Sequence, residues 1–393
     1  MSAATTAPRE IRPHDFLDTD HLLDDEERMI RDTVRAFVSD QVIPYVGDWF
    51  EEARIPRELA PALGKIGVLG MHLDGYGCAG ASATAYGLAC LELEAGDSGL
   101  RSMVSVQGSL AMFAIHRWGS EEQKQEWLPR MAAGEALGCF GLTEPDAGSD
   151  PGAMRTRARR DGDDWVLHGQ KMWITNGSAS EIAVVWARTD EGIRGFLVPK
   201  GTKGFTTQDI HRKLSLRASV TSELLLDDVR LPNGAMLPEA TSLRGPLSCL
   251  NEARYGIVWG AIGAARACFE SALAYAKDRT AFGRPIAATQ IQQHKLATMA
   301  LEVNRGLLLA LHLGRMKDAG RLRPEQEHGQ AGQRQRGAGG GPHGAAGARR
   351  QRDHAGVPGD PPHEQPRVRR HLRGDGRRAR PCGGQSPHRH RRV

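Results

Sequence analysis

Two stretches, GCFGLTEPDAGSD at Gly138–Asp150 and KMWITNG at Lys171–Gly177, decide how the rest of the chain is interpreted. The first combines glycines with a threonine and a serine, so that its backbone can approach a flat polar ring closely. The second places a tryptophan near a threonine at the end of a strand-like run. Either stretch alone also fits a polar turn beside a β-hairpin. The two together are far more specific, and they indicate a ligand site at the end of a strand.

The residues before and after these stretches predict an α–β–α order. Apolar residues recur at helical spacing in five segments before Gly138, and the last of them opens with Ser120 and Gln123, a helix-capping pair. These segments are 24–46, 57–66, 81–95, 102–117 and 120–133. Period-two runs then predict strands at 165–167, 172–175, 182–188, 193–198 and 222–229. Helical spacing returns in two long segments, 245–277 and 287–316.

We therefore expect an α+β fold with three ordered domains. The N-terminal helical domain covers 1–137, the middle β domain covers 138–235, and 245–325 begins a C-terminal helical domain. The composition changes after this point, because 326–393 holds 15 Arg, 14 Gly and 7 Pro but no aromatic residue. Such a segment cannot bury a core, and we expect it to be disordered.

Charge and composition exclude several broad classes of protein. The chain has 393 residues, 40% of them hydrophobic, and a net charge of +5 (52 − 47). The segment 326–393 carries +10 (15 Arg against 5 acids), so the rest carries −5, and a basic nucleic-acid binder is a poor interpretation of that body. The six cysteines and the histidines at 116, 168, 211 and 294 show no metal-ligand spacing. With no signal sequence and no apolar run of membrane-spanning length, we expect a cytoplasmic protein that binds neither metal nor membrane.

The two opening stretches resemble the flavin-binding signature of the acyl-CoA dehydrogenase family, and residues from about 15 to 325 are most similar to its glutaryl-CoA dehydrogenases. The resemblance implies the same α–β–α architecture and FAD as cofactor. It also implies that a proton leaves the carbon next to a thioester carbonyl while a hydride leaves its neighbour for the flavin. The implied partners are acyl-CoA, with glutaryl-CoA favoured, and an electron-transfer flavoprotein. The implied product is crotonyl-CoA, formed by oxidation and decarboxylation.

Several residues match the family's cofactor contacts. Those expected along the flavin are Phe140, Leu142, Thr143, Gly148, Ser149, Trp173, Ile174 and Thr175. For Trp173 the alternative is a core aromatic residue. The string DRTAFG at Asp278–Gly283 contributes Arg279 and Phe282, and Gln290 follows in the next helix. In the family the DRTAFG motif reaches the flavin pyrophosphate and adenosine of a neighbouring subunit, and the position of Gln290 is a further cofactor contact. The shared cofactor implies a homo-oligomer, typically a tetramer.

Substrate selection is expected at Glu94, Arg101 and Ser102. An arginine is costly to bury in an acyl pocket unless it has a partner, and a dicarboxylic acyl group supplies one in its far carboxylate. In the glutaryl-type enzymes the matching Arg and Ser hold that carboxylate, and the matching Glu lies nearby. The alternative is that Arg101 pairs with Asp97 on a surface helix. Further substrate contacts are expected at Ser149, Leu250 and Arg254.

The segment after residue 325 suggests a frameshift. When permissive codons for 350–376 are shifted by one base, they allow a run that resembles the family's C-terminus and ends in TYEGT. The family's glutaryl-type enzymes carry the catalytic base as the Glu of this motif. In the shifted frame its codon straddles the bases that encode Arg373 and Gly374. No catalytic base can therefore be assigned in the chain as written, although a natural basic tail remains the alternative.

Three functions remain open on these grounds. The first is an FAD-dependent glutaryl-CoA dehydrogenase that is impaired in this chain because the base is missing. The second is a catalytically inactive relative that binds flavin or acyl-CoA. The third is a polyanion binder that acts through the arginine-rich segment.

Overall fold

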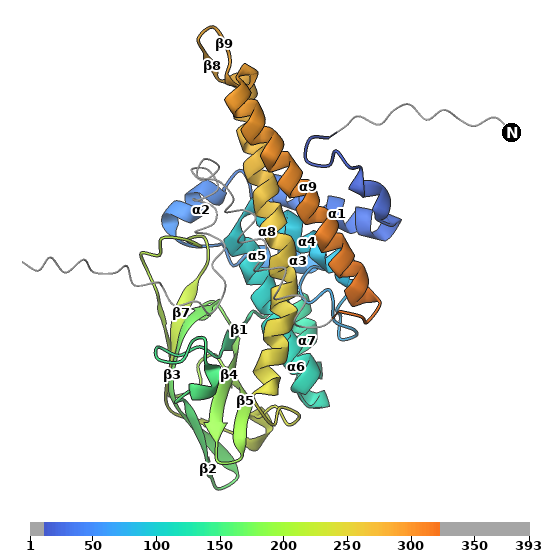
Figure 1. Ribbon diagram of the computed structural model, residues 1–393. Helices are drawn as coiled ribbons and strands as arrows, with labels where there is room; N and C mark the ends of the chain where they lie inside the picture. Colours follow the sequence, from blue (N-terminus) through green and yellow to red (C-terminus); the bar gives the residue numbers. More distant parts are fainter. Residues whose placement is uncertain (1–11, 323–393) are drawn as a thin grey trace, which may run out of the picture. The chain divides into compact units, whose positions relative to one another are not determined.

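The computed structural model describes residues 12–322, which all fall within the first of two contact units, 1–360. The whole of segment 326–393, and with it the expected disorder and frameshift, lies outside the described residues. The described order of elements is helices, then strands, then helices (Figure 1). The predicted α+β fold class is confirmed.

The N-terminal helices begin where polar residues can cap them. Helix α1 (Asp25–Gln41) starts with a capping box between Asp24 and Glu27, and α7 (Glu121–Ala132) starts with the predicted box between Ser120 and Gln123. The others are α2 (Val46–Glu52), α3 (Leu59–Lys65), α4 (Ala83–Gly96), α5 (Ser98–Ser105), the π-helix η2 (Val106–Met112) and α6 (Phe113–Trp118). Helices α5, η2 and α6 follow one another without a break and form one continuous helix with a π-helical middle. Short π-helical segments are frequent at functional sites.

The strands form a seven-stranded mixed sheet in the order β1-β4-β2-β3-β7-β6, with β5 paired to β4. Its members are β1 (Gly138–Gly141), β2 (Arg157–Asp161), β3 (Asp164–Thr175), β4 (Ile182–Thr189), β5 (Gly192–Pro199), β6 (Phe205–Asp209) and β7 (Thr221–Leu231). The predicted hairpin of β4 and β5 is confirmed. The two strands expected at 165–167 and 172–175 are one bulged strand, β3. Strands β2 and β6 were missed because their mostly exposed residues carry no apolar alternation.

Two long helices complete the described fold. Helix α8 (Arg244–Asp278) and helix α9 (Gln290–Asp318) run side by side, joined by a small hairpin of β8 (Thr280–Ala281) and β9 (Arg284–Pro285) (Figure 1). Within 12–322 these two helices are long and apolar enough to cross a membrane by length and composition alone. Such a test is weak evidence, because α8 contributes Trp259 and Phe269 to the core shared with α1 and α4.

Helix α9 is tied to α4 by one carboxylate. The side chain of Asp318 accepts hydrogen bonds from the backbone N–H of Ala83 at 2.6 Å and of Thr84 at 3.3 Å, and from the Thr84 hydroxyl at 2.6 Å. The two N–H groups belong to the first turn of α4, where backbone N–H groups have no acceptor within the helix. The last turn of α9 therefore acts as a cap for a helix more than 200 residues earlier (318 − 84 = 234).

We expect Asp318→Ala to lower the free energy of unfolding by about 1–2 kcal/mol, the usual range for losing a helix cap. The measurement is urea unfolding followed by far-ultraviolet circular dichroism. The matched control is Asp190→Ala, which removes an exposed carboxylate from the β4–β5 turn and should change stability by less than about 0.5 kcal/mol. Equal effects of the two substitutions would contradict the capping role of Asp318.

Candidate active site

Trp173 is turned out of the sheet by a bulge in β3. The pairing of β3 with β7 shifts register between Lys171 and Ile174, and Trp173 has φ +64°, in the left-handed region. Its side chain is 42% exposed, while Ile174 is buried. A non-glycine residue in this conformation is strained, and such strain clusters at functional sites. The alternative that Trp173 is a core aromatic residue is wrong, because this much of its side chain is exposed.

The two sequence stretches are bonded to each other. The backbone N–H of Met172 donates to the carbonyl of Thr143 at 2.9 Å. The buried ammonium of Lys171 donates to the Leu142 carbonyl at 3.1 Å and to a carboxylate oxygen of Glu144 at 2.7 Å. The loop and the strand end therefore form one rigid unit.

The buried pair of Lys171 and Glu144 was not predicted. Burial lowers the pKa of Lys171 to about 8, although Glu144 favours its charged form. Burial opposes the Glu144 carboxylate, but Lys171 and the hydrogen bonds from Thr156 and Arg155 hold its pKa below the ordinary value. A buried lysine whose partner lies in the other stretch is recognisable only in three dimensions, so the sequence carried no signal for it.

A second set of contacts joins the Gly138–Asp150 loop and the end of β3 to α5 and η2. The amide of Gln107 donates to the carbonyls of Met131 and Ala136, and its oxygen accepts from the N–H of Gly138 at 2.7 Å. The side-chain amide of Asn176 reaches the carbonyls of Met103 and Gly138, both at 3.4 Å. The start of the Gly138–Asp150 stretch, called the flavin-type loop below, is thus fixed to the helix that carries Arg101.

Arg101 is buried and paired with Glu94. Its Nε donates to a Glu94 carboxylate oxygen at 2.5 Å, and Arg101 is 3% exposed. The alternative of a surface pair with Asp97 is wrong, because the Asp97 side chain instead accepts from the N–H of Gly99 at 2.6 Å and caps α5. The expectation that Arg101 needs a partner is met within the chain by Glu94. Ser102 is buried beside it.

Electrostatics in this region favour a charged Arg101. Burial works against the guanidinium, but Glu94 raises the pKa of Arg101 above its ordinary value. Burial raises the pKa of Asp97 to about 6, with Glu94 adding to the effect. The buried Glu94 and Arg101 and the half-buried Asp97 therefore form a small charged cluster at the α4–α5 junction.

The other predicted residues divide into two groups. Phe140 and Leu142 are buried in the cluster against which Leu250 of α8 packs. Thr143, Gly148 and Thr175 are partly exposed, Ser149 is exposed, and Arg254 is half-buried and donates to Asn251 at 2.7 Å. These residues come from β1 and the loop after it, the end of β3 and the first half of α8.

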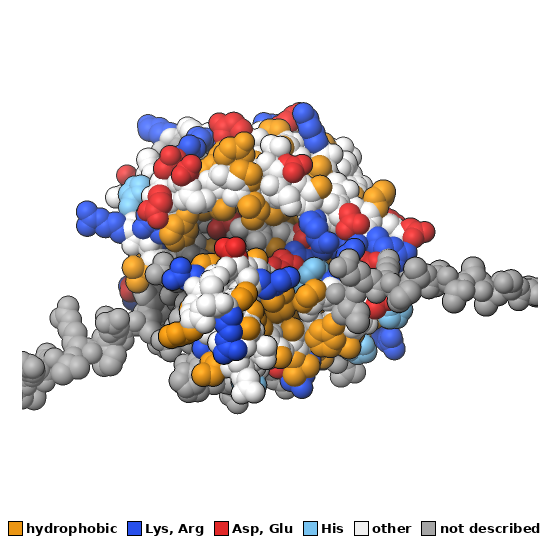
Figure 2. All heavy atoms as spheres, turned by 90° about the horizontal axis from the view of Figure 1, so that it is seen from above, with side chains coloured by type: hydrophobic (Ala, Val, Ile, Leu, Met, Phe, Trp, Pro, Cys, Tyr) orange, Lys and Arg blue, Asp and Glu red, His pale blue; other side chains and the backbone are white. Residues whose placement is uncertain are grey.

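Arg279, Phe282 and Gln290 lie far from this group. Arg254 and Asp278 are 24 residues apart along α8 (278 − 254), which is about 36 Å at 1.5 Å per residue. The hairpin that carries Phe282 projects from the end of α8, and this side chain is fully exposed at 102% (Figure 1). On the face seen from this end, hydrophobic, basic and acidic side chains are interspersed (Figure 2). Within this chain these residues therefore lie at the other end of α8 from Leu250 and Arg254.

Comparisons with known proteins identify the family of the chain. Profiles described as the acyl-CoA dehydrogenase N-terminal, middle and C-terminal domains match residues 24–135, 139–229 and 244–330. The chain belongs to the acyl-CoA dehydrogenase family. The family predicted from the two opening stretches is confirmed, and with it an oxidoreductase acting on CH–CH bonds in a FAD-dependent family.

The chain is similar to several individual acyl-CoA dehydrogenases with different named substrates. The chain is 37% identical over 303 residues to the bovine (Bos taurus) mitochondrial short-chain specific acyl-CoA dehydrogenase, covering 75% of this chain and 74% of that protein. It is 61% identical to a glutaryl-CoA dehydrogenase from Mycobacterium smegmatis solved with FADH2, covering 86% of each chain with a TM-score of 0.82. Butyryl-CoA dehydrogenase from Megasphaera elsdenii is 29% identical, covers 84% of this chain and 93% of that one, and gives a TM-score of 0.75.

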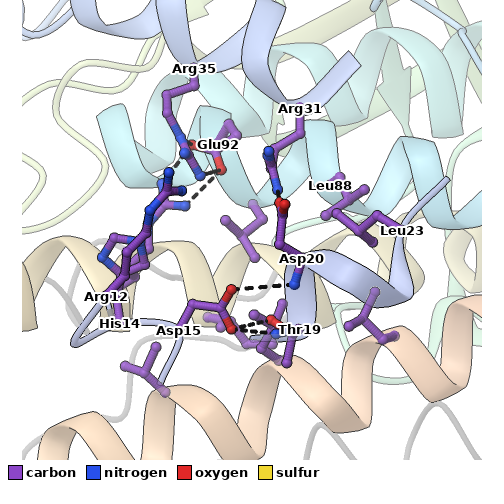
Figure 3. A pocket seen from close by; sticks show the side chains of 16 residues that line it. Arg12, His14, Asp15, Thr19, Asp20, Leu23, Arg31, Arg35, Leu88 and Glu92 are labelled. Carbon is purple, nitrogen blue, oxygen red and sulfur yellow. Dashed lines mark hydrogen bonds and ion pairs between the residues drawn. The ribbon is translucent and has the colours of Figure 1, made fainter. Parts of the chain in front are cut away.

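A cavity whose lining does not include Trp173 lies between the N-terminal segment and helices α1, α4, α8 and α9 (Figure 3). Its centre is Glu92, which is buried and bonded by Arg35 at 2.8 Å and by Arg266 at 2.6 and 2.7 Å. Arg31 pairs with Asp20 in the same cavity. The carboxylates that line it are satisfied by neighbouring groups, so the cluster joins three helices and is a structural element.

One group of potential metal ligands occurs within residues 12–322. His168 on β3 and Asp227 and Asp228 on β7 place their ligand atoms within 4.8 Å of one another, and all three are exposed. The prediction that His168 is not grouped with other potential metal ligands is therefore wrong. Exposed acidic groups commonly occur in this way without a metal ion, and these residues lie outside the candidate active site.

The acidic cluster beside Arg101 predicts a pH-dependent stability. Because the pKa of Asp97 is about 6 in the folded chain and 3.8 in the reference state, the folded form holds this proton more tightly. The resulting stabilisation is full below about pH 4 and is lost as the pH rises through 6. We expect Asp97→Asn, which keeps a helix-capping oxygen, to raise the free energy of unfolding at pH 7.5 by about 1–2 kcal/mol and to have little effect at pH 4.

The measurement is urea unfolding of both proteins at the two pH values. A stabilisation by Asp97→Asn that is the same at pH 4 and pH 7.5 would contradict the role assigned to the Asp97 proton.

Proposed function

We propose that this chain is built as an FAD-dependent glutaryl-CoA dehydrogenase, which oxidises and decarboxylates glutaryl-CoA to crotonyl-CoA. The observation that carries the proposal is Arg101, a buried guanidinium held by Glu94 on the helix next to the flavin-type loop. A straight apolar acyl chain has no use for a buried charge, whereas a far carboxylate pairs with it. The 61% identity to a glutaryl-CoA dehydrogenase supports the same substrate over the short-chain one.

The residues present fit a flavin. Trp173 supplies an exposed aromatic surface at a strained bulge, and Thr143 and Thr175 lie partly exposed on the two bonded stretches. Flat aromatic rings stack favourably, and threonine hydroxyls can bond the polar edge of such a ring. FAD, when bound, would supply the hydride acceptor. The chain's own residues would orient the ring, exclude water and bind the acyl group.

Arg279, Phe282 and Gln290 are proposed to serve the cofactor of a second copy. They are exposed and lie beyond the end of α8 that is far from Arg254. This supports a homo-oligomer, and the tetramer of the family is the proposed state. An electron-transfer flavoprotein is the proposed acceptor, and the cytoplasm is the proposed location.

The second candidate is an inactive relative that binds flavin or acyl-CoA without turnover. The match to the C-terminal domain profile ends at residue 330, and the printed sequence contains no TYEGT. Removing a proton next to a thioester requires a carboxylate within hydrogen-bond reach of that carbon. Its predicted position lies outside the described residues.

Purification of the chain followed by visible absorption tests both candidates. The proposed function predicts that the purified chain has a flavin absorption spectrum. It also predicts that denaturation releases a flavin that is identified as FAD. It also predicts that glutaryl-CoA shifts the melting temperature of the FAD-loaded chain more than butyryl-CoA does. A chain that binds no flavin and responds to neither ester would overturn both candidates and favour the polyanion binder.

A further inference from the structure

The bond between Arg101 and Glu94 uses one nitrogen and one oxygen. Carboxylates commonly accept two parallel hydrogen bonds from an arginine. Here Nε of Arg101 donates to a single Glu94 oxygen, Oε2. The other oxygen, Oε1, accepts from the hydroxyl of Ser98 at 2.5 Å. Ser98 is the first residue of α5 and is buried. The Ser98 hydroxyl therefore holds Oε1 of Glu94, while Oε2 bonds Nε of Arg101.

A glycine on α8 lies directly against this bond. A Cβ atom at Gly260 would be 3.0 Å from Oε2 of Glu94 and 3.3 Å from Nε of Arg101, the two atoms that are bonded. Both distances are tighter than ordinary contacts of a side-chain carbon. A methyl group there would push the carboxylate and the guanidinium apart, because neither can retreat from a packed helix interface.

We propose that Ser98 and Gly260 are positioning residues for acyl recognition. Together they hold Glu94 on Nε of Arg101, so that Nη1 and Nη2 are left for the far carboxylate of a dicarboxylic acyl-CoA. The proposal rests on the proposed function. It adds that discrimination between acyl groups with and without a terminal carboxylate depends on two residues that do not touch the substrate.

The chain offers a matched control for each residue. Ser109 also carries a buried hydroxyl in this region, but it bonds Tyr86 at 2.7 Å and not Glu94. Gly256 is one helical turn before Gly260, and a Cβ there would be 3.1 Å from Cys90 Sγ and from the Tyr86 hydroxyl. Both controls are as tightly packed as the test positions but lie off the Glu94–Arg101 bond.

The test uses the full FAD-loaded chain under anaerobic conditions, with dissociation constants for glutaryl-CoA and butyryl-CoA measured by titration calorimetry. We expect Ser98→Ala and Gly260→Ala to lower the glutaryl-to-butyryl preference at least about fivefold. Butyryl-CoA affinity itself should change less than about twofold. Ser109→Ala and Gly256→Ala should leave the preference within about twofold. Circular dichroism melts identify any variant that fails to fold. If Gly260→Ala fails to fold, Ser98→Ala alone still tests the proposal.

Failure of the inference and failure of the proposed function give different results. If Arg101→Ala abolishes the preference while Ser98→Ala and Gly260→Ala retain it, the positioning role is overturned and the proposed function stands. If the unmodified chain shows no preference for glutaryl-CoA, or binds neither ester, the proposed function is overturned and the inference with it.

Discussion

Restoring the predicted reading frame with a single-base correction near codon 326 is expected to raise turnover of glutaryl-CoA by about 10²–10⁴-fold, the usual contribution of a general base. The correction would return the Glu of TYEGT at the position whose bases now encode Arg373 and Gly374. Turnover would be measured with an artificial electron acceptor for the chain as printed and for the corrected chain, both loaded with FAD.

The control for this comparison is the corrected chain with the restored Glu changed to Gln. It should fall back to the rate of the printed chain while retaining flavin. Equal turnover by the printed and corrected chains would show that another residue serves as base and that the frameshift account of the segment after residue 325 is wrong.

The second large effect is expected at Arg101. In the corrected chain, Arg101→Ala should lower kcat/KM for glutaryl-CoA about ten- to a hundred-fold more than for butyryl-CoA, because a charge-assisted bond of about 1.5–3 kcal/mol is lost from one substrate and not the other. The substitution also leaves Glu94 buried without its cation, which costs stability. Butyryl-CoA therefore serves as the internal control for damage to the fold, and equal losses on both substrates would show that Arg101 is purely structural.

The order of elements could be predicted because amphipathic spacing and caps are local properties. The box at Ser120 and Gln123, the hairpin of β4 and β5 and the two long helices all follow from residues close together in sequence. Strands β2 and β6 could not be predicted in this way, since their mostly exposed residues lack apolar alternation.

The site was predictable in part. Resemblance of KMWITNG and GLTEP to a family placed the flavin-type residues, but no pattern indicated that Trp173 lies on a strained bulge. The buried pair of Lys171 and Glu144 and the Gln107 contact to Gly138 join residues 27 and 31 positions apart. Such contacts depend on how separate elements pack, which single-sequence spacing does not encode. Likewise, the partner of Arg101 is decided by its burial on α5 next to α4.

The acyl specificity of this flavin site is tested most directly by bleaching of bound flavin in the corrected chain. Under anaerobic conditions and without an acceptor, stoichiometric glutaryl-CoA should remove most of the visible absorbance of the FAD. Butyryl-CoA should need a large excess to do so, because it cannot pair with Arg101. Equal bleaching by the two esters, or a preference for butyryl-CoA, would contradict the assignment of a dicarboxylic acyl site at Arg101.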